Sequence, residues 1–141
     1  MSAMAANPLR KRVLLVDDNI AVRTLVHQLF ESEPSFEVVG EAENGREAIE
    51  KADNLKPDLV ILDLTMPVMN GFDAAAELMR RLPAMKIILF TVEEGPEVER
   101  LARQAGVQAV ISKDRAAQLI PQSYCLLGLA QGDSGPLENA S

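Results

Sequence analysis

The chain has 141 residues, of which 48% are hydrophobic, 25% charged and 4% aromatic; this is the composition of one ordinary globular domain rather than of a disordered or fibrous chain. Its formal net charge of −7 disfavours direct binding to nucleic acid or to an anionic membrane surface. The single cysteine excludes an internal disulfide, the N-terminal stretch lacks the apolar segment of a signal peptide, and no apolar run approaches the ~18 residues of a membrane span, so we expect a cytoplasmic protein.

Five short apolar runs follow one another along the chain, and each has the length of a buried strand. They cover residues 13–16, 36–39, 59–62, 87–90 and 109–111. Strands separated by whole helices must run parallel, with right-handed crossovers and helices on both faces of the sheet. We therefore predict an α/β fold, a doubly wound five-stranded parallel sheet with strand order 2-1-3-4-5 in a flavodoxin-like three-layer sandwich.

The segments between the runs carry apolar residues at helical spacing. The predicted helix faces are Val22, Leu25, Val26, Leu29 and Phe30; Ala48, Ile49 and Ala52; Phe72, Ala75, Ala76 and Met79; and Val98, Leu101, Ala102 and Ala105. Gly106 has the position of a helix C-cap glycine, and Pro121 should delay or kink a last helix over residues 117–130. His27, the only histidine, lies off the first stripe, and we expect it to be a solvated helix residue, because a lone histidine has no partner ligand.

Composition separates one domain from the two ends of the chain. We expect residues 1–10 to be a flexible N-terminus and residues 11–130 to be the domain itself. Residues 131–141 are rich in Gly, Pro, Ser and acidic residues, which predicts a tail or linker stub. The acidic stretch 93–99 should be a solvated loop and first helical turn, since acids are favoured near a helix N-terminus.

Side chains that can bind ligands or react follow four of the five apolar runs. Asp17 and Asp18 come after the first run, Asp63 after the third, Thr91 after the fourth and Lys113 after the fifth. In open parallel sheets, ligands bind beyond the carboxyl ends of the strands, where the strand order reverses. We therefore expect three carboxylates, a hydroxyl and an ammonium group to meet in one crevice.

Three neighbouring carboxylates repel one another and require a compensating cation. Mg²⁺ prefers oxygen ligands and is usually held by one or two carboxylates together with waters and phosphate oxygens. Because adjacent strand residues point to opposite faces, Asp17 and Asp18 cannot both ligate in the same way, and one of them should act through water or as an orienting group. A carboxylate can also attack phosphorus to give an acyl phosphate, with Lys113 and Thr91 meeting the phosphoryl oxygens.

Four motifs in this order resemble the response regulator receiver domain of two-component signalling, from about Lys11 to Gly132. The motifs are VLLVDDN with the acidic pair, LVILDLTMPVMNGFD with the phosphoacceptor, IILFT with the switch hydroxyl, and ISKD with the lysine. The resemblance implies that Asp63 is the phosphorylated aspartate, that Thr91 is the switch hydroxyl, and that Lys113 binds the phosphoryl group.

The resemblance also implies a metal site and partners. Asp18 and Asp63 would bind Mg²⁺ directly together with the backbone carbonyl of Thr65, and Asp17 would act through water. A histidine kinase or phosphotransfer protein would be the phosphodonor, and a downstream protein would bind the face made by the fourth helix, fifth strand and fifth helix. The chain would be no enzyme beyond its own aspartyl phosphorylation and dephosphorylation, and receivers of this kind can form homodimers on phosphorylation.

Two departures from the family pattern affect these expectations. Val110 stands where the family usually has an aromatic residue that moves with the switch threonine, so Thr91 should couple to the output face differently. Lys113 is followed by Asp114 where many members have proline, so a cis bond there is no longer favoured.

The output and the reaction each leave an alternative. The Lys-Asp pair and the LLGLAQG segment resemble receivers attached to helix-turn-helix domains, so the chain is interpreted either as a receiver without an output domain of its own or as a fragment of a DNA-binding regulator. A small Mg²⁺-dependent phosphohydrolase of the haloacid dehalogenase type would use the same acyl-phosphate chemistry. Such enzymes carry an acid two residues after the nucleophile, where this chain has Thr65, so signalling is the preferred interpretation.

Overall fold

The structure, a computed structural model, describes residues 10–130. At its centre is a parallel sheet of β1 (Lys11–Val16), β2 (Phe36–Ala42), β3 (Leu59–Leu62), β4 (Lys86–Thr91) and β5 (Ala109–Ser112) in the order β2-β1-β3-β4-β5. The predicted fold class and strand order are confirmed. The predicted tail at 131–141 and all but Arg10 of the predicted N-terminus lie outside the described residues, and the domain bounds at 11 and 130 stay a prediction.

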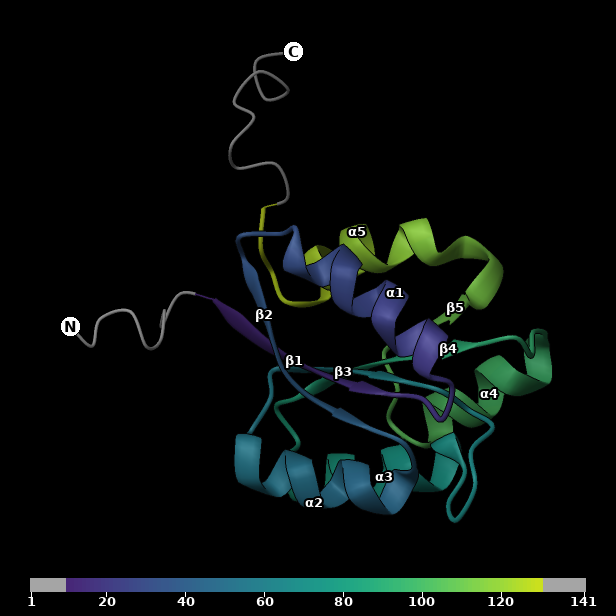
Figure 1. Cartoon of the computed structure of the whole chain (residues 1–141). Coiled ribbons are helices and arrows are strands. Elements are labelled where there is room, and N and C mark those ends of the chain that lie inside the picture. The colour runs from purple at the N-terminus through teal and green to yellow at the C-terminus, as the bar shows by residue number, and fades with distance from the viewer. Residues whose placement is uncertain (1–9, 131–141) are drawn as a thin grey trace.

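Helices cover both faces of the sheet (Figure 1). The helical segments are α1 (Ile20–Glu31), α2 (Gly45–Leu55), α3 (Gly71–Arg81), α4 (Pro96–Gln104), the 3₁₀ helix η2 (Lys113–Gln118) and α5 (Leu119–Leu126). Because side chains alternate along a strand, Val13 and Leu15 of β1 pack on the side of α1 and α5, whereas Leu14 and Val16 pack on the side of α2 and α3. None of the helices between residues 10 and 130 has the length and apolar composition that crossing a bilayer requires.

Two predicted helix faces are rotated relative to the structure. On α1, Leu25 is 47% exposed, whereas Arg23 is buried. On α3, Ala76 is exposed, and Ala74 and Leu78 are fully buried instead. In α3 the run of small alanines supports two overlapping stripes equally well, so periodicity alone does not choose between them. In α1 the prediction used apolar character only, and it therefore missed a buried cation that has polar partners on other elements.

Helix α4 ends where the sequence predicted, whereas α5 ends earlier than predicted. Gly106 ends α4 with φ 91°, as predicted, and the N–H of Val107 returns to the carbonyl of Ala102 at 2.9 Å. Helix α5 starts two residues later than predicted, with Pro121 in its first turn, where a missing N–H costs no helical hydrogen bond. The predicted continuation to residue 130 is wrong, because Gly128 at φ 67° terminates α5 at Leu126.

Candidate functional site

The carboxyl ends of β1 and β3 bring the predicted acidic residues together. The two strands are adjacent and Val16 is paired with Leu62, so the next residues, Asp17 and Asp63, leave the sheet side by side. The backbone N–H of Asp63 donates to the carbonyl of Val16 at 2.9 Å. One carboxylate oxygen from each of Asp17, Asp18 and Asp63 lies within 4.8 Å of the other two. The order of the strands in the sheet, with β1 beside β3, thus gathers three negative charges at one point.

Lys113 brings a positive charge to two of these carboxylates from the end of β5. Its Nζ lies 2.7 Å from Oδ2 of Asp17 and 3.3 Å from Oδ1 of Asp63. Burial lowers the pKa of Lys113, but the contacts with Asp17 and Asp63 outweigh it and raise that pKa above its ordinary value. Lys113 therefore stays charged and compensates part of the negative charge.

Asp63 keeps an unfavourable environment for its charge despite the lysine. The residue is 5% exposed. Burial first, and then the negative charge of Asp17, raise the pKa of Asp63 from 3.8 to about 6, while Lys113 opposes the shift. The carboxylate is thus ionised at neutral pH but more basic than an ordinary aspartate.

The adjacent acids Asp17 and Asp18 have different surroundings. Asp17 is 4% exposed, and its Oδ1 accepts the backbone N–H of Asn19 at 2.9 Å while its Oδ2 pairs with Lys113. Asp18 is exposed to solvent. Both carboxylate oxygens of Asp17 are therefore engaged by the protein, whereas the exposed Asp18 keeps a carboxylate oxygen within 4.8 Å of those of Asp17 and Asp63.

Thr91, at the end of β4, is linked to the loop that follows β3 by an acidic residue that the sequence analysis did not single out. The buried Thr91 hydroxyl donates to one carboxylate oxygen of Glu93, and the Thr65 hydroxyl donates to the other at 2.9 Å. These two hydrogen bonds hold the pKa of Glu93 below its usual range. Glu93 was expected in a solvated loop; an acid two residues after a strand-end hydroxyl is the only signal the sequence carries for this contact.

The start of α3 fixes the other side of the same loop. The N–H of Gly71 donates to the carbonyl of Leu64 at 2.7 Å, and a Cβ at Gly71 would lie 2.8 Å from the Cα of Leu64. Only glycine allows this approach without a backbone shift. Between them, Val68 is 69% exposed and has a φ of 74°, a conformation that is unfavourable for a β-branched residue.

The two departures from the family pattern have structural counterparts. Val110 is partly buried and packs against the core cluster on the side of α4. Across the described residues no peptide bond is cis, which includes the bond between Lys113 and Asp114 and agrees with the prediction for this pair.

His27, expected to be a solvated helix residue, is half-buried and has two carboxylate neighbours. Its Nδ1 lies 2.8 Å from Oε2 of Glu41 on β2, and its Nε2 lies 3.6 Å from Oε2 of Glu31 on its own helix. The partner on β2 lies 14 positions along the chain, a relation that helix periodicity does not contain.

Comparison with known proteins places this geometry in a family context. The chain matches the response regulator receiver domain over residues 13–124. It is 44% identical over 103 residues to the chemotaxis protein CheY of Thermotoga maritima, which covers 73% of this chain and 85% of that protein. It is 40% identical over 102 residues to the nitrate/nitrite response regulator protein NarL of Escherichia coli K12, and the match covers 72% of this chain and 47% of that protein. A chain of the CheX–CheY–BeF₃–Mg²⁺ complex of Borrelia burgdorferi superposes with a TM-score of 0.78 at 26% identity, and the superposition covers 83% of this chain and 89% of that chain.

Replacement of Asp63 by asparagine should stabilise the metal-free protein above pH 6. Because folding raises the pKa of Asp63 from 3.8 to about 6, the folded state binds more protons than the unfolded chain in this window, and stability falls as the pH rises through it. Asp63→Asn removes this loss. Its gain in free energy of unfolding should be near zero at about pH 4 and about 1 to 3 kcal/mol at about pH 7.5, measured by urea unfolding in the presence of a chelator. An equal gain at both pH values would contradict this origin of the shift.

Replacement of Glu93 by glutamine should speed phosphorylation by a small phosphodonor such as acetyl phosphate. The substitution removes a negative charge beside the site and weakens the hold on the Thr91 hydroxyl. A partly exposed charge contributes about 1 kcal/mol at most, so we expect a rate increase of up to about fivefold. Glu94→Gln is the matched control, since the exposed Glu94 pairs with Arg115 at 3.9 Å and, among residues 10–130, has no other ion pair. Equal rates for the two variants would show that the Glu93 contact does not restrain the site.

Proposed function

The chain belongs to the response regulator receiver domains of two-component signalling, and from this premise we propose that Asp63 is the residue that accepts the phosphoryl group. Receiver domains are signalling domains that act with histidine kinases and downstream partners. In the proposed step, a carboxylate oxygen of Asp63 attacks the phosphorus of a kinase phosphohistidine. The P–N bond breaks, its electron pair stays on the imidazole nitrogen, and Asp63 becomes an acyl phosphate.

The environment of Asp63 is the observation that carries this proposal. The carboxylate is buried, is ionised at neutral pH with a pKa raised to about 6, and has the Lys113 ammonium 3.3 Å from one oxygen. A more basic carboxylate is a better nucleophile, and the ammonium group can meet the charge of the incoming phosphoryl oxygens. Thr91 would donate its hydroxyl to another phosphoryl oxygen after leaving Glu93, which makes it the proposed switch residue.

The proposed metal ligands are the carboxylates of Asp18 and Asp63 and the backbone carbonyl of Thr65, with Asp17 acting through water. The donor set fits Mg²⁺, because it consists of hard oxygen ligands whose negative charge exceeds what Lys113 compensates. Asp17 suits the indirect role, since both its carboxylate oxygens already accept from Asn19 and Lys113. When bound, Mg²⁺ would neutralise the carboxylates and take one phosphoryl oxygen.

The proposed output is a change of partner contacts in the cytoplasm. Phosphorylation would draw Thr91 toward Asp63 and alter the face made by α4, β5 and α5, to which a downstream protein or a second copy of the chain would bind. Because Val110 replaces the usual aromatic residue, the movement would pass through the Thr91–Glu93–Thr65 contacts. The chain would catalyse only its own phosphorylation and dephosphorylation, and it would contact neither nucleic acid nor membrane itself.

Two relatives represent two routes of output. The matched region is 85% of the length of the chemotaxis protein CheY but 47% of the length of NarL. We propose signalling by partner contacts as the main route, with a receiver portion of a DNA-binding regulator as the alternative. The position of the stop codon in the full reading frame decides between them.

Incubation with acetyl phosphate and Mg²⁺ tests the proposed phosphorylation. We expect one phosphoryl group on Asp63 by mass spectrometry, its loss with a chelator, and its absence in Asp63→Asn. Asp53→Asn, on the exposed surface of α2, should keep the label. Asp18→Ala should impair labelling at least as much as Asp17→Ala.

Three outcomes would contradict the assignment. Undiminished label in Asp63→Asn would exclude Asp63 as the acceptor, and a larger loss in Asp17→Ala than in Asp18→Ala would reverse the metal ligands. Sustained turnover of a phosphate ester such as p-nitrophenyl phosphate would favour the phosphohydrolase alternative.

A further inference from the structure

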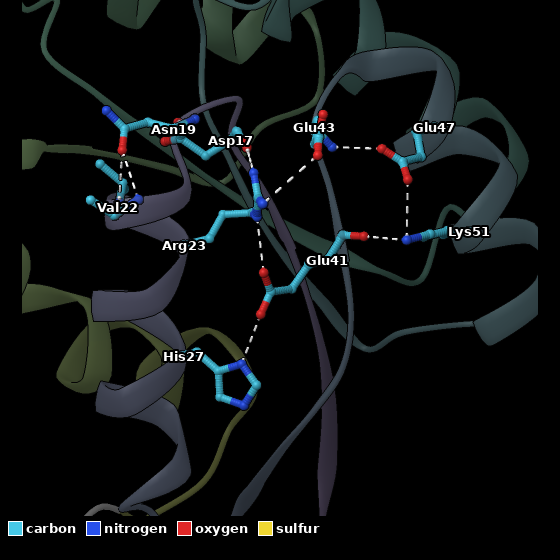
Figure 2. A network of polar contacts seen from close by, with 10 residues as sticks. Asp17, Asn19, Val22, Arg23, His27, Glu41, Glu43, Glu47 and Lys51 are labelled. Carbon is cyan, nitrogen blue, oxygen red and sulfur yellow. Dashed lines mark hydrogen bonds and ion pairs between the residues drawn. The ribbon is translucent and has the colours of Figure 1, made fainter.

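Arg23 is a buried cation near the acidic site that the proposed phosphorylation does not use. It lies on the first turn of α1, and the residue is 7% exposed. Its Nη1 donates to the backbone carbonyl of Asp17 at 2.6 Å, and its Nε donates to Oε1 of Glu41 on β2 at 2.9 Å (Figure 2). The guanidinium group therefore joins α1, β2 and the end of β1, and a buried arginine left without such partners would be strongly unfavourable.

The carbonyl that Arg23 binds belongs to the peptide unit between Asp17 and Asp18. This peptide is planar, so a hydrogen bond to the carbonyl also restricts the backbone N of Asp18. On the other side of Asp17, its own N–H donates to the carbonyl of Ala42 at 3.0 Å. The backbone of Asp17 is thus held by β2 through its N–H and by α1 through its C=O. The direction in which the chain enters Asp18 depends on both contacts.

Glu41 holds Arg23 in this orientation. Oε2 of Glu41 lies 2.8 Å from Nδ1 of His27, and the Lys51 ammonium donates to the backbone carbonyl of Glu41 (Figure 2). Hydrogen bonding by His27, and more weakly by Arg23, lowers the pKa of Glu41 although burial raises it. The carboxylate therefore stays ionised opposite the guanidinium group.

This pairing also keeps the charge of Arg23 away from the metal ligands. The guanidinium group meets Asp17 at its backbone carbonyl, while the carboxylate of Asp17 turns to Lys113 and to the N–H of Asn19. A second carboxylate, Glu43, lies 4.0 Å from Nη2 of Arg23. Arg23 can thus act as a hydrogen-bond donor to the backbone without competing with a cation for the Asp17 and Asp18 carboxylates.

We infer that Arg23, braced by Glu41, is a positioning residue for divalent cation binding: it fixes the Asp17–Asp18 peptide so that the Asp18 carboxylate faces the shared site with Asp63. The inference rests on the proposed function, since it concerns the same cation. It adds residues that touch neither the cation nor the phosphoryl group and that come from α1 and β2.

A Mg²⁺ titration of phosphorylation tests the inference. The rate of Asp63 labelling by a fixed concentration of acetyl phosphate is measured against Mg²⁺ concentration on the full chain. Arg23→Ala should raise the Mg²⁺ concentration for half-maximal rate by about tenfold, as for other residues that orient metal ligands. The rate at saturating Mg²⁺ should stay close to that of the unsubstituted protein, because Arg23 does not contact the phosphoryl group. Arg23→Lys should have an intermediate effect. Lysine keeps the positive charge, but it has one donor nitrogen where arginine uses Nε toward Glu41 and Nη1 toward the Asp17 carbonyl.

Two further variants separate positioning from a general loss of stability. Arg81→Ala removes another guanidinium group that joins two elements, α3 and Asp53 of α2, and it should leave the Mg²⁺ requirement unchanged. Glu41→Gln should raise the requirement by itself but add little in the Arg23→Ala background, because both residues act through one contact. Calorimetric titration with Mg²⁺ alone provides a readout that needs no phosphodonor.

The outcomes distinguish this inference from the proposed function. An unchanged Mg²⁺ requirement in Arg23→Ala, or in Arg23→Lys if the alanine variant does not fold, would overturn the positioning role while Asp63 remains the acceptor. A lower labelled fraction at saturating Mg²⁺ without a shifted midpoint would also overturn it, since that result indicates a structural role only. If the unsubstituted protein shows no Mg²⁺-dependent label at all, the proposed function itself fails.

Discussion

The repulsion between three carboxylates at one edge of the sheet is the constraint on which the site depends. Parallel strands in the order β2-β1-β3-β4-β5 deliver Asp17, Asp18 and Asp63 to the same edge, and one ammonium group, that of Lys113, reaches only two of them. Burial first, and then the negative charge of Asp17, raise the pKa of Asp63 to about 6. In the proposed function, this electrostatic cost in the metal-free protein would favour the uptake of a cation, and phosphoryl acceptance would then depend on that cation.

The fold supports the charged groups from two sides. On one side, α1 and β2 hold the backbone at Asp17 through Arg23 and the carbonyl of Ala42. On the other, a bridge from the Thr91 hydroxyl through Glu93 to the Thr65 hydroxyl ties the end of β4 to the loop after β3. The first support is buried and should be permanent, whereas the second must open if Thr91 is to reach a phosphoryl group. In the proposed function, the Arg23 contact would position the acidic residues, and the Thr91–Glu93–Thr65 bridge would take part in switching.

The sequence predicted the sheet and the residues at its strand ends well, because parallel strands separated by helices leave few topologies and because strand ends share one edge. It did not predict the partners of Arg23, His27 or Glu93. Arg23 and His27 meet Glu41, which is 18 and 14 positions away on another element, and that contact depends on the register of β2 against β1. Apolar periodicity does not contain such relations, and it also placed Leu25 inside although α1 turns Arg23 inward instead.

The most direct measurement of the central claim is a crystal structure grown with Mn²⁺, which replaces Mg²⁺ and can be located by its anomalous scattering. If the three carboxylates form one cation site, the anomalous map should contain a peak in contact with the carboxylates of Asp18 and Asp63 and the backbone carbonyl of Thr65, with Asp17 one water molecule away. The absence of a peak at the carboxyl end of β1 and β3, or a peak bound by Asp17 in place of Asp18, would contradict the account.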